Sequence, residues 1–103
     1  MIAIRTEGNA YMGEGHIMRT LAIAQALRRL GGEAVFITGD NGPAERIGAA
    51  GFGHFVLHAA DWREEILLLR ALTAKFGVQT LLVDSYGVTP EYFEACNRFV
   101  KTA

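Results

Sequence analysis

Short runs of apolar residues alternate along the chain with longer stretches in which apolar positions recur at helical spacing. Glycine or proline separates most of these stretches from the next. The short runs predict β-strands, and the longer stretches predict helices that cover them. The predicted strands span residues 1–6, 33–38, 52–57 and 79–84, and the predicted helices span 16–30, 43–50, 61–76 and a last segment that begins at 89.

The ends of the helices carry recognisable signals. Asp61 and Glu64 form an acidic variant of the capping box, and Thr89 precedes a proline and a glutamate, as a capping hydroxyl does. Glycines at 31–32 and at 77 follow two of the predicted helices, where a left-handed residue commonly ends the helical turn. These signals support the predicted boundaries.

Four successive β-α units predict an α/β fold, a Rossmann-like three-layer sandwich with a parallel sheet in the order 3-2-1-4. The fourth strand is apolar at every position from Thr80 to Val83, which is typical of a strand buried on both faces. In that order it lies at an edge, and an apolar edge invites pairing with a fifth strand, a partner chain or a second copy.

Residues 99–103 stop where the last helix should lead onward, so residues 1–103 are expected to form one domain of a truncated protein. A complete small domain is the alternative.

Composition narrows the class of protein. The chain has 103 residues, half of them apolar, a net charge of −1 and no cluster of basic residues, so we expect no nucleic-acid partner. A single cysteine, Cys96, excludes an internal disulfide and a metal site built from several cysteines, and it is expected to be an inert, half-buried thiol. No apolar run approaches the ~20 residues of a membrane span or forms a signal peptide, so the expected location is the cytoplasm.

The connection between the first strand and the first helix, residues 7–16, is rich in glycine. It falls at the carboxyl edge of the sheet, where open α/β sheets bind ligands, and it leads into a helix amino terminus with unpaired N–H donors. A dinucleotide fingerprint fails, because Met18 occupies the third glycine position after Gly13 and Gly15. A phosphate-binding P-loop is also excluded, because no lysine follows.

His16 stands in the first turn of the helix, behind two glycines, where packing explains it poorly. The helix terminus disfavours the charged ring, and a neutral imidazole can accept a proton from water or a hydroxyl. The alternative is a histidine that only caps or packs the loop. Arg19 shares a helix face with His16 and could hold an anion; a salt bridge or a solvated guanidinium is the alternative.

Asp84 ends the fourth strand, next to the first strand in the predicted order. It would lie across from the glycine-rich loop, so Asp84 is predicted, with His16, to be a catalytic or positioning residue. There it either contacts His16 and makes the ring more basic or accepts hydrogen bonds from loop amides. A purely structural acid is the alternative. Tyr86 could donate a hydrogen bond to a sugar hydroxyl or merely line the site.

Other polar residues receive simpler interpretations. Glu7 could brace the loop, and Glu14 reads as a solvated acid. His54 and His58 read as surface or packing residues, because neither has a carboxylate at metal-ligand spacing. Trp62 is expected to cover the edge of the sheet. Residues 40–42, Asp-Asn-Gly, predict a turn.

Residues 5–9, 12–19 and 21–24, followed by 82–88 (Leu-Val-Asp-Ser-Tyr-Gly-Val), resemble the sequence of the UDP-sugar hydrolases of the pseudaminic-acid pathway and the related spore coat polysaccharide biosynthesis proteins of SpsG type. The resemblance covers essentially this whole chain, but only about the first third of a family member. The glycine-rich core is also similar to that of the lipid II N-acetylglucosaminyltransferase.

This resemblance implies the amino-terminal half of a GT-B fold, in which two Rossmann-like domains enclose the active site. The nucleotide is then held mainly by a carboxyl-terminal domain that this chain lacks. His16 takes the role of the base that activates water, so that the anomeric C–O bond breaks and UDP leaves without a metal or other cofactor. Asp84 and Tyr86 line the sugar side, while Arg19 and Glu7 support the loop.

In the same picture Gly13, Glu14 and Gly15 surround the substrate. Family members often carry aspartate where this chain has Glu7, which makes the role of that side chain less secure. The leading hypothesis is a hydrolase acting on a UDP-linked deoxy-amino sugar for surface polysaccharide synthesis. The alternatives are a glycosyltransferase and a non-catalytic fragment.

Overall fold

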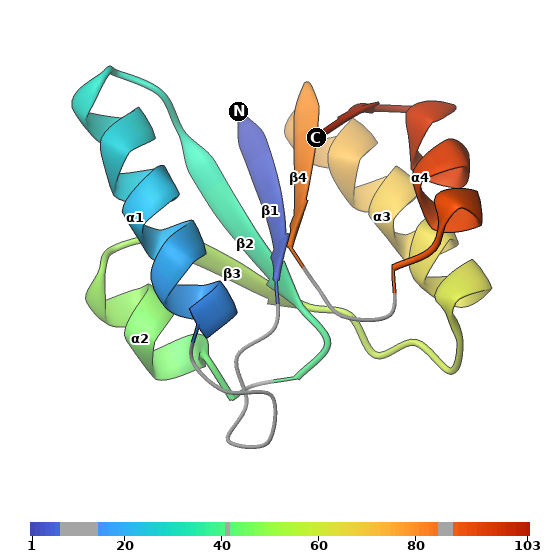
Figure 1. Cartoon of the computed structure of the whole chain (residues 1–103), viewed down its shortest axis with the longest axis horizontal. Coiled ribbons are helices and arrows are strands. Elements are labelled where there is room, and N and C mark those ends of the chain that lie inside the picture. Colours follow the sequence, from blue (N-terminus) through green and yellow to red (C-terminus); the bar gives the residue numbers. More distant parts are fainter. Residues whose placement is uncertain (7–14, 41, 85–87) are drawn as a thin grey trace.

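The computed structural model describes residues 1–6, 15–40, 42–84 and 88–103. Strands and helices alternate along them, as Figure 1 shows. The strands are β1 (Ile2–Thr6), β2 (Ala34–Thr38), β3 (Gly53–Val56), β4 (Thr80–Asp84) and β5 (Lys101–Thr102), and the helices are α1 (Gly15–Arg29), α2 (Ala44–Ala49), α3 (Trp62–Phe76) and α4 (Pro90–Asn97).

Within the described residues the strands form one parallel sheet in the order β3-β2-β1-β4-β5, which confirms the predicted order 3-2-1-4 and extends it by one strand. Helices α1 and α2 cover one face of the sheet, and α3 and α4 cover the other (Figure 1). The strand order therefore reverses between β1 and β4. At their carboxyl ends, Thr6 of β1 lies beside Asp84 of β4.

Successive residues of each strand point to opposite faces, and each face has its own apolar core. Beneath α1 and α2 the buried residues include Ile4, Ile17 and Phe36. Beneath α3 and α4 they include Leu69 and Leu81. Each such side chain contributes roughly 1.5–3 kcal/mol when fully buried, so the two cores hold the three layers together.

The predicted helix ends are confirmed in detail. The Asp61 carboxylate accepts a hydrogen bond from the Glu64 amide at 2.9 Å, and the Thr89 hydroxyl oxygen accepts one from the amide of Tyr92 at 3.2 Å. The Glu64 side chain reaches back to the amide of Ala60, one residue before the cap. Gly77 ends α3 with φ of 64°, the left-handed conformation that favours glycine.

The carboxyl end of the chain differs from the prediction. After α4 it does not lead away from the domain but turns back, and Lys101–Thr102 pairs with β4 beside Thr80 and Leu81. The Ala103 amide donates to the Leu81 carbonyl at 2.9 Å, and its carbonyl accepts from the Val83 amide at 3.0 Å.

Of the partners predicted for the apolar edge of β4, the structure shows the fifth strand: β5 pairs along this stretch. Two copies could pair through that edge only by displacing β5. The expected burial of the strand on both faces holds for Leu81 alone, whereas Leu82 and Val83 are half-buried, because β5 is short and covers one end of β4. None of the helices in the described ranges is long and apolar enough to cross a bilayer.

Candidate functional site

The carboxyl ends of β1 and β4 mark the point where the sheet changes direction. The helix that follows β1 lies on one face, and the helix that follows β4 lies on the other (Figure 1). In open α/β sheets this reversal is the usual place for a ligand, because the two connections diverge there. The polar residues at these strand ends are therefore the first candidates for chemistry.

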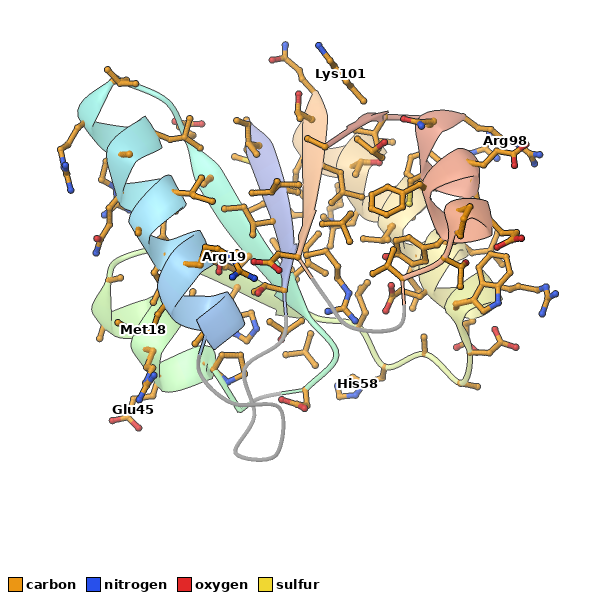
Figure 2. The ribbon with its side chains drawn as sticks, viewed as in Figure 1. Met18, Arg19, Glu45, His58, Arg98 and Lys101 are labelled. Carbon is orange, nitrogen blue, oxygen red and sulfur yellow. The ribbon has the colours of Figure 1, made fainter. Side chains whose placement is uncertain are left out.

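Arg19 of α1 reaches the end of β4 and binds Asp84 with two parallel hydrogen bonds. Arg19 Nε lies 2.8 Å from Asp84 Oδ2, and Arg19 Nη2 lies 2.7 Å from Asp84 Oδ1. Figure 2 shows Arg19 extending from α1 toward these strand ends. The fork geometry of guanidinium and carboxylate fixes both groups in one plane.

The Arg19–Asp84 pair contributes more to geometry than to stability. The Arg19 side chain is 58% exposed and that of Asp84 is 19% exposed, so solvent screens their attraction. Exposed ion pairs typically contribute about 0–1 kcal/mol. The pair does tie α1 to β4 and holds a guanidinium at the reversal point with much of its surface open to solvent.

The sequence left the partner of the Asp84 carboxylate open between two alternatives. The two alternatives there were a contact with His16 and hydrogen bonds from loop amides, and the structure adds Arg19 as a partner of both carboxylate oxygens. For Arg19 the salt bridge, one of its predicted alternatives, is present.

The other predicted site residues lie either in the first turn of α1 or outside the described residues. Gly15 begins α1 and His16 follows it in the first turn, but the His16 side chain lies outside the described part of the structure. Outside the described residues lie Glu7, Gly13, Glu14 and Tyr86.

Two buried threonines join the end of β1 to α1. The Thr20 hydroxyl lies 3.5 Å from the Thr6 hydroxyl and donates to the Ile17 carbonyl at 3.2 Å, and both threonines are fully buried. The first turns of α1 are thus seated directly on the strand end beside Asp84.

A third polar group lies farther along the same edge, after β2. The Thr38 hydroxyl lies 2.6 Å from both the Asp40 carbonyl and His54 Nε2. Because the hydroxyl has one proton and the carbonyl can only accept, we assign the proton between the other two atoms to His54 Nε2. Burial lowers the pKa of His54, and the negative charge of the nearby Asp40 partly opposes this shift.

The turn predicted after β2 is also present. The Asp40 carboxylate accepts a hydrogen bond from the Gly42 amide at 2.8 Å.

Comparison with known proteins identifies a solved structure with a similar fold. No protein-family model matches the chain, and no curated protein matches it in sequence. A solved structure does match: a glycosyltransferase from Rickettsia africae ESF-5, with a TM-score of 0.77 and 14% sequence identity. The match covers 98% of this chain and 28% of that one. The fold is glycosyltransferase-like.

A buried polar network that was not predicted from the sequence lies on the opposite face of the same edge. Arg5 Nη2 lies 2.9 Å from Glu65 Oε1, and the Tyr92 hydroxyl donates to Glu65 Oε2 at 2.5 Å. Arg5 also donates to the Thr6 carbonyl at 2.8 Å, where β1 ends. An arginine inside an otherwise apolar strand was the available signal, because a buried charge requires a partner.

Within the described residues, no three His, Cys, Asp or Glu side chains gather closely enough to hold a metal ion.

Proposed function

We propose that this chain is the sugar-side, amino-terminal half of a two-domain enzyme that transfers or hydrolyses a nucleotide-activated sugar. The observation that carries the proposal is the Arg19–Asp84 pair at the reversal point of a glycosyltransferase-like sheet. It holds a cation beside the amino terminus of α1, which suits the phosphate or hydroxyl groups of such a substrate.

The proposed division of labour follows from the positions of the residues. The Asp84 carboxylate orients Arg19, so in this proposal Asp84 is a positioning residue and Arg19 contacts the substrate. His16, in the first turn of α1, is the proposed base. Gly13, Glu14 and Gly15 are proposed to surround the substrate, Tyr86 to contact the sugar and Glu7 to support the loop, as the sequence resemblance implies.

In the proposed reaction an oxygen nucleophile attacks the anomeric carbon and gives its proton to neutral His16. The bond between the anomeric carbon and the phosphate oxygen breaks, and UDP leaves with the bonding electrons. Water as nucleophile makes the enzyme a hydrolase, whereas an acceptor hydroxyl makes it a glycosyltransferase. The resemblance of residues 12–19 to the UDP-sugar hydrolases supports the first version, and the fold of the solved glycosyltransferase suits both.

A second domain is part of the proposal. The chain spans 28% of the length of the solved glycosyltransferase, which agrees with a fragment of a larger protein. We infer that a carboxyl-terminal domain supplies most contacts to the nucleotide.

Titration of UDP-N-acetylglucosamine onto the isotopically labelled chain, followed by NMR, tests the location of the site. We expect binding weaker than about 1 mM, since most nucleotide contacts are absent, with amide shifts concentrated in residues 15–20 and 82–84. Arg19→Gln should reduce these shifts, and Arg29→Gln, at the exposed far end of α1, should not. Shifts confined to another surface would contradict the proposal.

The role of His16 is tested in the full-length protein by measuring UDP release. His16→Ala should lower turnover by ~10²–10⁴ while the circular dichroism spectrum stays unchanged. An unchanged rate would remove His16 from the mechanism. UDP release without an added acceptor indicates the hydrolase, and release that requires an acceptor indicates the transferase.

A further inference from the structure

The carboxyl end of β1 is held from both faces of the sheet. Arg5 and Thr6 are successive residues there, so their side chains point to opposite faces. The Arg5 side chain lies on the face of α3 and α4, where it contacts Glu65. The Thr6 side chain lies on the face of α1, where its hydroxyl is 3.5 Å from that of Thr20. Both Arg5 and Thr6 are buried, so a polar contact on each side fixes this strand end.

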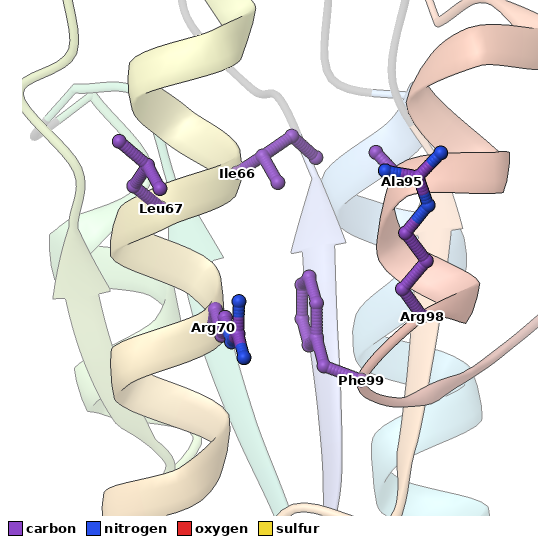
Figure 3. Close-up of a pocket in the computed structure, with 6 residues that line it drawn as sticks. All are labelled: Ile66, Leu67, Arg70, Ala95, Arg98 and Phe99. Atoms are coloured by element: carbon purple, nitrogen blue, oxygen red, sulfur yellow. The ribbon is translucent and has the colours of Figure 1, made fainter.

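The contacts on the face of α3 and α4 meet at the carboxylate of Glu65. One of its oxygens accepts from Arg5 and the other accepts from Tyr92, so these three side chains form a buried network. On the side away from the sheet, a groove of about 250 Å³ separates Ile66 of α3 from Ala95 of α4 (Figure 3). On the side toward the sheet, the hydrogen bond between Glu65 and Tyr92 joins the first turns of the two helices.

The guanidinium of Arg5 connects this network to the backbone of β1. Its Nη2 lies 2.9 Å from the Glu65 carboxylate, and its Nη1 donates to the Thr6 carbonyl at 2.8 Å. The pairing of β1 with β2 ends at Arg5, and its pairing with β4 ends at Thr6, beside Asp84. The Arg5 side chain therefore supplies a donor to the strand at the point where the regular pairing stops.

The Arg19–Asp84 pair lies at the same strand end, on the other face. Asp84 is the register partner of Thr6 on β4. Arg19 immediately precedes Thr20, whose hydroxyl lies beside that of Thr6. One member of the pair is thus on the strand next to Thr6, and the other is on the helix that covers it. Because both are placed against Thr6, a displacement of the end of β1 would change the distance between them.

We propose that the buried network positions the Arg19–Asp84 pair on the other face of the sheet. The network holds the end of β1 through the Thr6 carbonyl, and Thr6 in turn sets where α1 and the end of β4 lie. Its members are positioning residues, since they act on the site only through Thr6. The coupling is a property of the chain by itself, whereas its effect on catalysis rests on the proposed function of Arg19.

Stability alone accounts poorly for a buried network that contains two charges. Replacing a buried ion pair by apolar side chains of similar volume is often neutral or stabilising, because removing two charges from water costs about as much as their attraction returns. Apolar side chains at these three positions would fill the same space, but they would not donate to the Thr6 carbonyl. The network therefore adds a defined geometry at the end of β1 more than it adds cohesion.

Three variants separate positioning from general stability. The triple variant carries Arg5→Met, Glu65→Leu and Tyr92→Phe, so it removes the network and leaves no buried charge behind. Tyr92→Phe alone keeps the ion pair and removes only the contact from α4. Thr73→Val is the matched control, because it removes a buried hydroxyl about two turns farther along α3, away from the end of β1. The circular dichroism spectrum of each variant shows whether it is folded.

Proton exchange at the arginine side chains, measured by NMR on the isotopically labelled chain, tests the coupling without a substrate. The Arg19 Nε proton is held by Asp84, and Arg29, at the exposed far end of α1, is the reference. In the triple variant the Arg19 proton should exchange at least about fivefold faster than in the parent, with Arg29 unchanged. Tyr92→Phe should give an intermediate rate and Thr73→Val the parent rate. A parent rate for Arg19 in the triple variant and in Tyr92→Phe, or equal acceleration by Thr73→Val, would overturn the proposal.

A double-mutant cycle on UDP release by the full-length protein tests whether the network acts through Arg19. Arg19→Gln and the triple variant should each lower kcat/KM at least about tenfold, and their combination should lower it little further than either alone. Losses that multiply would show two independent effects and overturn the coupling to Arg19. A parent protein that releases no UDP would contradict the proposed function instead, and the arginine exchange rates would still decide the positioning proposal.

Discussion

The network of Arg5, Glu65 and Tyr92 should respond to mutation in a way that a simple count of lost contacts does not anticipate. The Glu65 carboxylate accepts from a guanidinium and from a phenol, and the side chains of Arg5 and Glu65 are only 7% and 13% exposed. Removing the carboxylate should therefore cost far more than removing either hydrogen bond.

The magnitudes follow from this burial. Glu65→Leu leaves the Arg5 guanidinium buried without its carboxylate, and breaking a buried pair in this way costs roughly 3–5 kcal/mol. Tyr92→Phe removes one hydrogen bond to a charged group and should cost about 1.5–3 kcal/mol. For a domain of this size each kcal/mol lowers Tm by about 4–8 °C, so Glu65→Leu should lower it by at least about 12 °C.

The decisive variant replaces all three residues together: Arg5→Met, Glu65→Leu and Tyr92→Phe. It leaves no charge to be compensated, so its free energy of unfolding should lie above that of Glu65→Leu alone and within about 2 kcal/mol of the parent. Urea unfolding followed by circular dichroism at 222 nm measures all of these values. Glu33→Leu, at an exposed acid, is the control and should change stability by less than about 0.5 kcal/mol.

Two results would refute this reasoning. One is a Glu65→Leu variant that loses less than about 1 kcal/mol, and the other is a triple variant less stable than Glu65→Leu. An independent check uses alkaline pH. Burial, together with the hydrogen bond to Glu65, raises the pKa of Tyr92 far above its usual value near 10. The resulting stabilisation should be complete below pH ~10 and decline as pH rises above it, and Tyr92→Phe should lack this decline.

Three further predictions concern single sites. Burial, aided by the negative charge of Glu65, raises the pKa of Cys96 to about 11, so the native thiol should react with iodoacetamide at pH 8 at least about 100-fold more slowly than in denaturant; equal rates would show that it is accessible. Because burial lowers the pKa of His54, the free energy of unfolding should fall as pH drops below 6.5, the ordinary pKa of histidine. His54→Gln keeps a donor for the Thr38 hydroxyl but does not titrate. Its Tm, measured between pH 5 and 8, should therefore depend less on pH than that of the parent. Asp61→Ala should lower the free energy of unfolding by about 1 kcal/mol through loss of the cap on α3, and a urea midpoint unchanged from the parent would contradict this.

Much of the fold could be predicted from the sequence because its determinants are local. Alternating periodicities of strand and helix predict the β-α units, and the order of β1 to β4 then follows from the strand order common to doubly wound sheets. Asp61, Thr89 and Gly77 each act within a few residues of their own position, so the helix ends that they form could be read directly. Arg19 stands near the start of α1, so its place at the carboxyl edge of the sheet also followed from the predicted start of that helix.

The partners of the polar side chains were decided by the tertiary structure alone. Arg19 and Asp84 are separated by 65 positions, Arg5 and Glu65 by 60, and nothing in the local pattern around any of them specifies the other. Their pairing depends on strand register and on the seating of α1 and α3 against the sheet, which only the assembled layers define. Strand β5 has the same origin: Lys101–Thr102 is too short to show a periodicity, and it becomes a strand because β4 offers backbone groups that must be paired.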